Sequence, residues 1–212
     1  EEVTKYIIYL KEKNIPVLQP DVNKSKTYFS VQGDAVRFGL SALKGVGVGA
    51  TEKIIDERNE RGEFKNFPDF VFRCAPLLNK RMLEGLISAG AFDCFGVHRS
   101  QLLAVYESVL DRANKINKQK SSLQMSLFGD IIEEDVTDIS YPNIPELETN
   151  DKLAREKAVL GVYVSGHPFE GYMHAFRDCS FSCQKMQNYE EDEEGRRTYP
   201  ELTDGAPVTM GG

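Results

Sequence analysis

A glycine-rich stretch near residue 45 has the clearest chemical pattern in this sequence of 212 residues. It reads Leu-Lys-Gly-Val-Gly-Val-Gly-Ala over residues 43–50, and a helical pattern follows it. A tight turn before a helix exposes backbone N–H groups where the helix dipole also favours an anion. Glycine permits the sharp turn and the close approach of a phosphate. The stretch predicts a phosphate-binding site with the expected contacts Lys44, Gly45, Val46, Gly47, Gly49 and Lys53.

Two other interpretations of these glycines stay open. A plain glycine turn between packed helices needs no ligand. The spacing of Gly45, Gly47 and Ala50 also fits the G-x-G-x-x-G/A fingerprint of dinucleotide sites, which requires a preceding strand and a βαβ unit. Residues 41–44 make a poor strand and helices continue downstream, so the fingerprint is disfavoured. The sequence has no G-x-x-x-x-G-K-[ST] motif, which excludes a P-loop.

A second pattern is suited to a protein partner and lies in a polar stretch, where a linear motif would be accessible. A glutamine amide followed by an aliphatic–aromatic pair can anchor in an apolar pocket. The residues of this pattern are Gln124, Met125, Ser126, Leu127 and Phe128. The alternative is that Leu127 and Phe128 pack back onto the fold.

The remaining reactive side chains give no catalytic pattern. His167 lies in a predicted turn over residues 161–168, without a Ser/His/Asp or Cys/His arrangement nearby, which favours a structural role. The four cysteines form no C-x-x-C pair, which indicates reduced thiols in a cytosolic protein. A metal site built from His174, Cys179 and Cys183 is the disfavoured alternative. No catalytic residue, metal or cofactor is therefore expected in this stretch.

Helices are expected to position these motifs. Apolar spacing predicts helices over residues 3–13, about 50–61, from 67, from 79 and about 98–116. A further helix is predicted over residues 151–160. Gly62 should end the helix over about 50–61, and Pro68 suits the first turn of the helix that begins at 67. Asn79 and Asp151 are the predicted N-caps of the helices that they begin. A short helical segment is also expected to end at Lys44, just before the glycines.

The segments between these helices are predicted to be turns, a hairpin and a linker. Residues 14–23 should break the first helix, and residues 27–31 and 36–38 should form a small β-hairpin around Gly33-Asp34. Residues 117–150 predict a partly extended linker, and the acidic run 190–194 predicts a solvated loop before a strand near Val208. No apolar run is long enough to span a membrane.

The charge is unevenly distributed, which matters for an anionic partner. The net charge is −7, but residues 1–40 carry +1 and residues 41–120 carry +3. Residues 121–150 contain seven acidic and no basic side chains, and residues 151–212 add −4. The net negative charge thus lies in one segment and the tail, outside the central helical region, which remains compatible with binding nucleic acid.

The order of several motifs resembles a known family. Residues 41–61 resemble a helix-hairpin-helix motif, which binds the DNA backbone without reading sequence, and residues 124–128 resemble a clamp-binding motif. Four pieces, in order, are similar to the alpha subunit of bacterial DNA polymerase III. They are residues 19–23, 43–49 with 54–58, 86–93 and 163–168.

The resemblance implies a mainly α fold with a domain containing two helix-hairpin-helix motifs, an N-terminal β-hairpin and the first part of a truncated OB-fold. Residues 1–40 would end the fingers region, 41–116 would form the DNA-binding domain and 117–150 the linker with the clamp motif. A helical connector over 151–177 and the OB-fold from 178 to 212 would follow. The second hairpin, at Gly90-Ala91-Phe92, lacks the Gly-x-Gly pattern, which weakens the case for a phosphate contact there.

The function implied by the resemblance is a non-catalytic segment of a cytoplasmic, DNA-directed DNA polymerase, a nucleotidyltransferase. Its partners would be double-stranded primer–template DNA, the sliding clamp (beta subunit) and other replisome subunits. Polymerisation needs clustered carboxylates that hold two Mg²⁺ ions, which the family carries in an upstream palm domain. No D-x-D pair occurs here, so this stretch should not polymerise, and its ends are expected to be cut from a longer chain.

Two other functions remain as alternatives. A repair or recombination accessory could use the same hairpin on DNA, although the clamp motif and residues 163–168 argue against it. A protein-interaction scaffold without DNA contact is favoured by the net negative charge.

Overall fold

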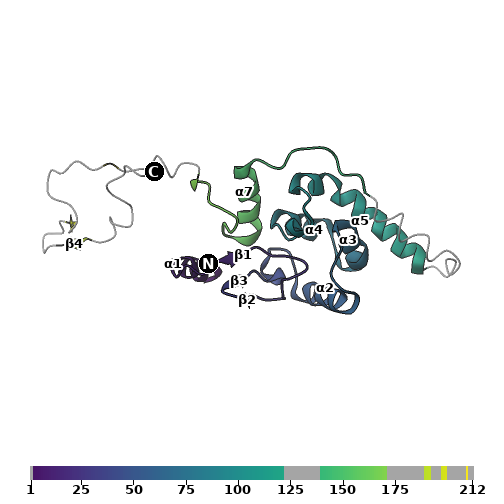
Figure 1. Cartoon of the computed structure of the whole chain (residues 1–212), viewed down its shortest axis with the longest axis horizontal. Helices are drawn as coiled ribbons and strands as arrows, with labels where there is room; N and C mark the ends of the chain where they lie inside the picture. Colours follow the sequence, from purple (N-terminus) through teal and green to yellow (C-terminus); the bar gives the residue numbers. More distant parts are fainter. Residues whose placement is uncertain (1, 122–138, 171–188, 192–196, 200–208, 210–212) are drawn as a thin grey trace. The chain divides into compact units, whose positions relative to one another are not determined.

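The computed structural model describes residues 2–121, 139–170, 189–191, 197–199 and 209 (Figure 1). The chain divides into two compact units, Glu1–Gly166 and His167–Gly212. In the second unit, strand β4 (Glu190–Glu191) pairs antiparallel with β5 (Arg197–Thr198), so the acidic run begins in a strand. The expected strand near Val208 lies outside the described residues, as does most of the segment assigned to an OB-fold.

The first unit is mainly helical, which confirms the predicted fold class. Its α-helices are α1 (Glu2–Glu12), α2 (Val48–Arg61), α3 (Phe67–Cys74), α4 (Lys80–Ser88), α5 (Arg99–Ser121) and α7 (Thr149–Leu160). Short 3₁₀ turns occur at Leu40–Ala42, Ala75–Leu77 and Asp93–Phe95. Within the described ranges, no helix combines the length and the apolar character needed to cross a bilayer.

A small three-stranded sheet lies beside these helices, in the order β1-β3-β2. The predicted hairpin is confirmed, because β2 (Ser30–Gln32) and β3 (Ala35–Arg37) pair antiparallel on either side of Gly33. Strand β1 (Val17–Leu18) was not predicted, and it pairs parallel with β3. The stretch expected to be only a break between elements therefore also contributes an edge strand.

Local capping signals set several helix ends as predicted. Asn79 Oδ1 accepts a hydrogen bond from the N–H of Met82 at 2.8 Å, and Pro68 lies in the first turn of α3. Gly62 follows α2 with a φ of 82°, a conformation that favours glycine. The prediction that Asp151 caps its helix is wrong, because α7 begins two residues earlier, after Glu148. Asp151 lies instead in the first turn, where a negative charge still suits the helix dipole.

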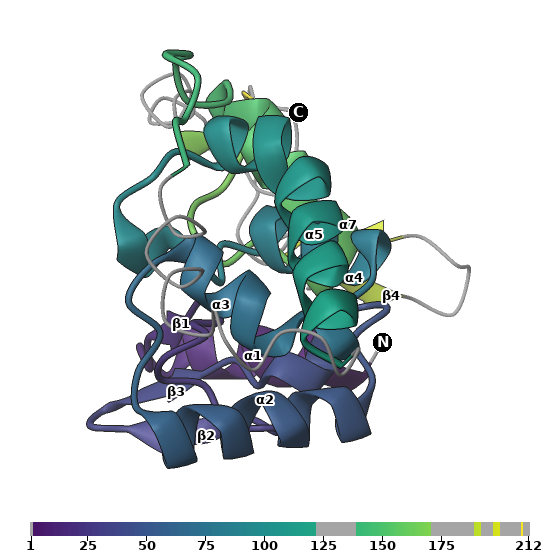
Figure 2. The same ribbon diagram turned by 90° about the vertical axis from the view of Figure 1, so that its right-hand side faces the viewer.

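The core lies where α5 crosses α3 and α4 (Figure 2). The rings of Phe67 and Phe70 meet Phe92 edge-on, with centroids 5.0 Å and 4.9 Å apart. Aromatic pairs in this geometry add stability beyond the burial of their area. The same core contains the fully buried side chains Leu83, Leu86, Ile87 and Leu102.

The chain returns to this core after α5. Helix α5 extends five residues beyond the predicted end at Ile116, and residues 122–138 are not among those described. Residues 139–148, here called the return segment, contain neither helix nor strand, in line with a partly extended linker. Ile139 and Tyr141 nevertheless pack against the core, and burial raises the pKa of Tyr141.

Candidate functional site

The predicted phosphate site forms a tight turn in front of α2, which we call the first hairpin (residues 43–47). Leu43 and Val46 are buried, whereas Lys44, Gly45 and Gly47 are exposed. The buried pair fixes the turn to the core. The backbone of Lys44, Gly45 and Gly47 is therefore held at the surface.

The element before this hairpin is shorter than predicted. Only Leu40–Ala42 form a 3₁₀ turn, where a helical segment ending at Lys44 was expected. The N–H groups of Leu40 and Ser41 donate to the carbonyl oxygens of Lys26 and Thr27, which ties this stretch to the preceding loop. No strand lies directly before Gly45 in this described part, so the dinucleotide fingerprint lacks its structural context.

Backbone donors are available at the start of α2. Gly47 is the N-cap and carries no side chain, and the first helical hydrogen bond runs from Thr51 N to Gly47 O at 3.0 Å. The N–H groups of Val48, Gly49 and Ala50 have no hydrogen-bond partner among the residues that the structure describes. The first turn also contains no acidic residue. Such an end is electropositive and can receive an anion.

The glycines of this stretch have different structural requirements. Gly45 has a φ of 84°, so the turn requires glycine there. Gly47 has an ordinary extended conformation, and a Cβ placed at Gly47 or Gly49 would meet no atom within 4 Å. Packing within the chain therefore does not require glycine at these two positions. Their effect is to leave open surface in front of the N–H groups, where an external backbone could approach.

Two distant helices hold the first hairpin. The N–H of Lys44 donates to the carbonyl oxygen of Val159 in α7 at 3.1 Å. On the other side, a Cβ on Gly85 of α4 would lie 3.8 Å from the carbonyl oxygen of Lys44. Lys53 is exposed further along α2, and no described contact brings it to the turn. Arg81 of α4, which belongs to no motif in the sequence, also lies beside Gly45, because α4 packs on the hairpin.

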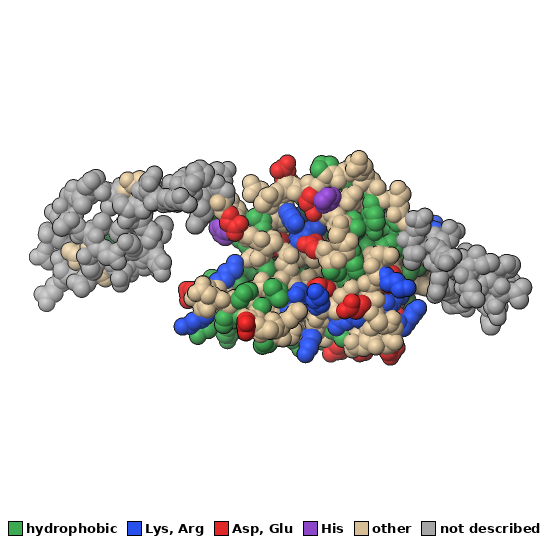
Figure 3. Space-filling view, in the orientation of Figure 1, with side chains coloured by type: hydrophobic (Ala, Val, Ile, Leu, Met, Phe, Trp, Pro, Cys, Tyr) green, Lys and Arg blue, Asp and Glu red, His purple; other side chains and the backbone are tan. Residues whose placement is uncertain are grey.

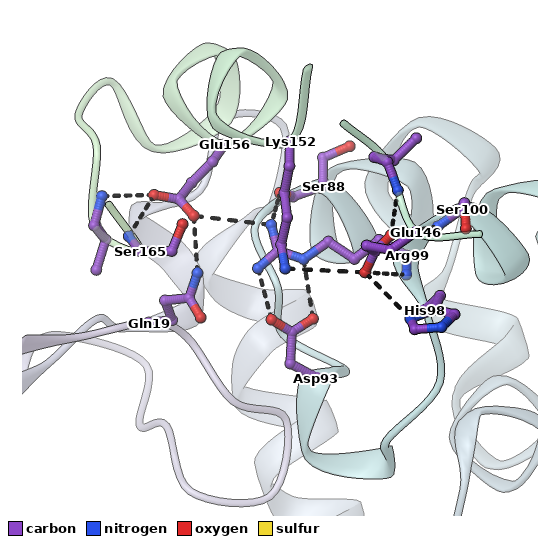
Figure 4. A network of polar contacts seen from close by, with 12 residues as sticks. Gln19, Ser88, Asp93, His98, Arg99, Ser100, Glu146, Lys152, Glu156 and Ser165 are labelled. Carbon is purple, nitrogen blue, oxygen red and sulfur yellow. Dashed lines mark hydrogen bonds and ion pairs between the residues drawn. The ribbon is translucent and has the colours of Figure 1, made fainter. Parts of the chain in front are cut away.

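The second hairpin (residues 89–98, between α4 and α5) differs because its helix N-terminus is occupied. Glu146 of the return segment accepts hydrogen bonds from the N–H groups of Arg99 and Ser100, at 3.1 Å and 3.2 Å. Figure 4 shows this carboxylate against the start of α5. A carboxylate of the chain itself therefore takes the place that a phosphate would need. This arrangement gives a physical reason for a missing Gly-x-Gly pattern there.

The environment of Glu146 favours its ionised form. Burial opposes the charge, but the N–H groups of Leu147, Arg99 and Ser100 and the nearby Lys152 outweigh it. Together they lower the pKa of Glu146 below its ordinary value. The Glu146 carboxylate also lies 3.8 Å from His98 and 3.9 Å from Lys152.

We expect Glu146→Gln to destabilise the chain at neutral pH, with a difference that shrinks as the pH falls. Glutamate titrates near ~4.3 in an unfolded chain. Because the folded pKa is lower, the carboxylate stabilises the fold above that pH, and this stabilisation is lost as the pH falls through the folded pKa. Losing such a helix-terminal anion costs about 1 kcal/mol. Urea unfolding at about pH 7 and about pH 3 measures the difference.

Glu148→Gln provides the matched control, because Glu148 is exposed and its side chain makes no capping hydrogen bond. It should change the free energy of unfolding by less than about 0.5 kcal/mol. A Glu146→Gln cost that stayed constant across the pH range would contradict the capping role.

Behind the second hairpin lies a buried ionic network, centred on Arg99. The Arg99 side chain is only 1% exposed and donates to both carboxylate oxygens of Asp93, at 3.0 Å and 2.6 Å. Its third hydrogen bond goes to the carbonyl oxygen of Ser88 at 3.0 Å. Gly90 has a φ of 81°, and a Cβ there would collide with the Arg99 guanidinium. Gly90 thus accommodates an arginine of the chain.

Glu156 of α7 extends the network to other parts of the chain (Figure 4). It is fully buried, 3.8 Å from Arg99, and accepts a hydrogen bond from the Gln19 side chain at 2.8 Å. Its other oxygen accepts from the N–H groups of Val164 and Ser165. Residues 19–23, 86–93 and 163–168, singled out separately in the sequence, therefore meet in one network. Their arrangement supports an architectural role, in keeping with the structural interpretation of residues 161–168.

The other sequence predictions have partial or no structural counterparts. The candidate clamp residues Gln124, Met125, Ser126, Leu127 and Phe128 lie outside the described residues, as do His174, Cys179 and Cys183. Among the residues described, no cluster of His, Cys, Asp and Glu could hold a metal ion. Cys74 and Cys94 are free thiols, and burial is the main cause that raises the pKa of each to about 12.

Comparison with known proteins identifies similar sequences. A family model described as a helix-hairpin-helix motif matches residues 14–102, which include the first hairpin and the start of α5. The DNA polymerase III subunit alpha of Campylobacter jejuni is 38% identical over 81% of this chain. The subunits of Thermus aquaticus and Deinococcus radiodurans are 36% and 38% identical over 92% and 80% of the chain. The aligned part spans only 13–16% of the length of these three relatives.

Proposed function

Because the chain belongs to the family of DNA polymerase III alpha subunits, we propose that it binds the backbone of duplex DNA without reading sequence. The observation that carries this proposal is the open first hairpin, with three backbone N–H groups that have no described partner. The family match to a helix-hairpin-helix motif over the same residues supports it. Contacts to phosphates fix position on a duplex but carry no sequence information.

The two hairpins are proposed to have different roles. The first would receive a phosphate, because its helix start is exposed and its glycines leave room. The second would stabilise the domain, because Glu146 already accepts hydrogen bonds from the start of α5. The net charge of −7 and the single open hairpin lead us to expect weak DNA binding by this chain alone.

The wider role follows from the family. We propose that the chain acts within a replicative polymerase, on primer–template DNA in the cytoplasm, alongside other replisome subunits. Residues 124–128 are proposed to bind the sliding clamp, which would keep the enzyme on its template. The chain alone is proposed not to extend a primer, since its sequence has no paired carboxylates of the D-x-D kind for Mg²⁺. The Mg²⁺ site is proposed for another part of the longer relatives.

A salt titration with a labelled duplex tests the proposal. Affinity should be independent of sequence and fall steeply as salt rises, because bound cations are released from the DNA. Gly47→Val should weaken binding and leave the fold largely intact, because a Cβ at this position meets no atom within 4 Å. Gly49→Ala should weaken binding while raising the stability of the chain by about 0.5–1 kcal/mol, since alanine favours the helix.

Thermal unfolding of both variants serves as the control for the fold. Binding that is flat across salt, or that depends on sequence, contradicts a phosphate site. Gly49→Ala binding as tightly as the unmodified chain would also count against close approach of the DNA at this turn.

A further inference from the structure

We infer that Arg81 is a further DNA phosphate contact, which acts beside the first hairpin from a different helix. This inference rests on the proposed function and adds a residue outside the glycine motif. Arg81 lies in the first turn of α4 and is exposed. It is separated from the turn by 36 residues in the sequence.

The packing of α4 places the Arg81 guanidinium at the hairpin. Its Nε lies 3.9 Å from the position that a Cβ on Gly45 would occupy. One helical turn further along α4, Gly85 lies against the carbonyl oxygen of Lys44. Gly85 and Arg81 therefore lie on the same face of α4, and both lie next to the first hairpin. A DNA strand that crosses Gly45 would therefore pass close to Arg81 as well as to the start of α2.

The neighbouring charges leave Arg81 available for an anion. Lys80 is hydrogen-bonded to Glu107 and lies 3.9 Å from Asp111. Glu84, the nearest acidic residue along α4, lies 3.9 Å from Arg155. Arg81 has no hydrogen bond or ion pair with any residue in the part of the chain that the structure describes. Arginine suits this position, because its planar guanidinium can donate two parallel hydrogen bonds to a phosphate.

The test compares two adjacent cations on the same helix end. Arg81→Gln and Lys80→Gln remove the same charge, but only Arg81 lies beside Gly45. Binding of the whole 212-residue chain to a labelled duplex is measured by fluorescence anisotropy across a range of salt concentrations. Arg81→Gln should weaken binding about tenfold at low salt, as expected for one charge-assisted contact. Its slope of log K against log salt should also be shallower by about 0.9, the amount for one phosphate.

Lys80→Gln should change affinity less than about twofold, since Lys80 is already paired with acidic groups. Arg81→Lys should retain the salt slope and recover part of the affinity, because a lysine keeps the charge without the planar fork. Thermal unfolding checks that each variant is folded.

The variants distinguish a failure of the Arg81 contact from a failure of the proposed DNA-binding function. Equal effects of Arg81→Gln and Lys80→Gln, with Gly47→Val still weakening binding, would overturn the role of Arg81 and leave the first hairpin as the DNA site. If Gly47→Val also binds like the unmodified chain, the proposed function itself fails.

Discussion

Replacing Glu156 with alanine should lower the free energy of unfolding by about 3–5 kcal/mol, as expected when one partner of a buried ionic network is removed. Glu156 is fully buried and lies 3.8 Å from Arg99, which is itself only 1% exposed. Alanine would leave the N–H groups of Val164 and Ser165 without their acceptor. It would also leave the Gln19 amide unpaired, so three donors at the edge of the buried carboxylate would lose their acceptor together.

Arg155→Ala is the matched control for this variant, on the preceding residue of the same helix. Arg155 is 46% exposed and lies 3.9 Å from Glu84, which is 48% exposed. An exposed pair of this kind contributes about 0–1 kcal/mol. Urea unfolding followed by circular dichroism measures both variants. A Glu156→Ala variant as stable as Arg155→Ala would show that the network does not stabilise the fold.

The double variant Leu127→Ala, Phe128→Ala should bind the sliding clamp at least ~100-fold more weakly than the unmodified chain. The expectation follows from the proposal that Leu127 and Phe128 fill an apolar pocket of the clamp while the Gln124 amide bonds at its rim. Truncating buried anchors of this kind costs ~2 kcal/mol or more each, and two such losses account for the change in affinity. Surface plasmon resonance with immobilised clamp measures it.

A second apolar pair in the same stretch supplies the control. Ile131→Ala with Ile132→Ala removes similar apolar volume outside the motif and should leave clamp binding unchanged. The Leu127, Phe128 variant should also melt within a degree or two of the unmodified chain if the two side chains support no core. The alternative, that they pack onto the fold, predicts a loss of ~2–5 kcal/mol for each side chain. A large loss of stability with unchanged clamp binding would rule out the tether.

The parts of the fold that the sequence predicted well are those with local signals. Asn79 caps α4 through a hydrogen bond to a residue three positions away, and Gly62 ends α2 through its own φ angle. The glycine hairpin was found in the same way, because its turn and its helix N-terminus are consecutive in the chain. Its glycines were only partly understood, since Gly45 alone needs a positive φ.

The features that the sequence did not predict depend on residues far apart. Strand β1 is two residues long, too short for any periodicity, and forms only because Val17 pairs with Val36. The α5 N-terminus is capped by Glu146, 47 residues after Arg99, so no local capping pattern exists. Arg81 reaches the first hairpin through the packing of α4. None of these is encoded in a short window of sequence.

The described parts of the first unit on either side of residues 122–138 are joined to each other by their own contacts. Glu146 binds the start of α5, and Lys44 is hydrogen-bonded to Val159, so both sides of this stretch are attached to one body. A chain cut here should remain assembled as two noncovalently associated pieces. An insertion here should also be tolerated, since doubling the length of chain between two attachment points costs only about 0.6 kcal/mol. The length of this stretch should therefore be free to change without changing the domain on either side of it.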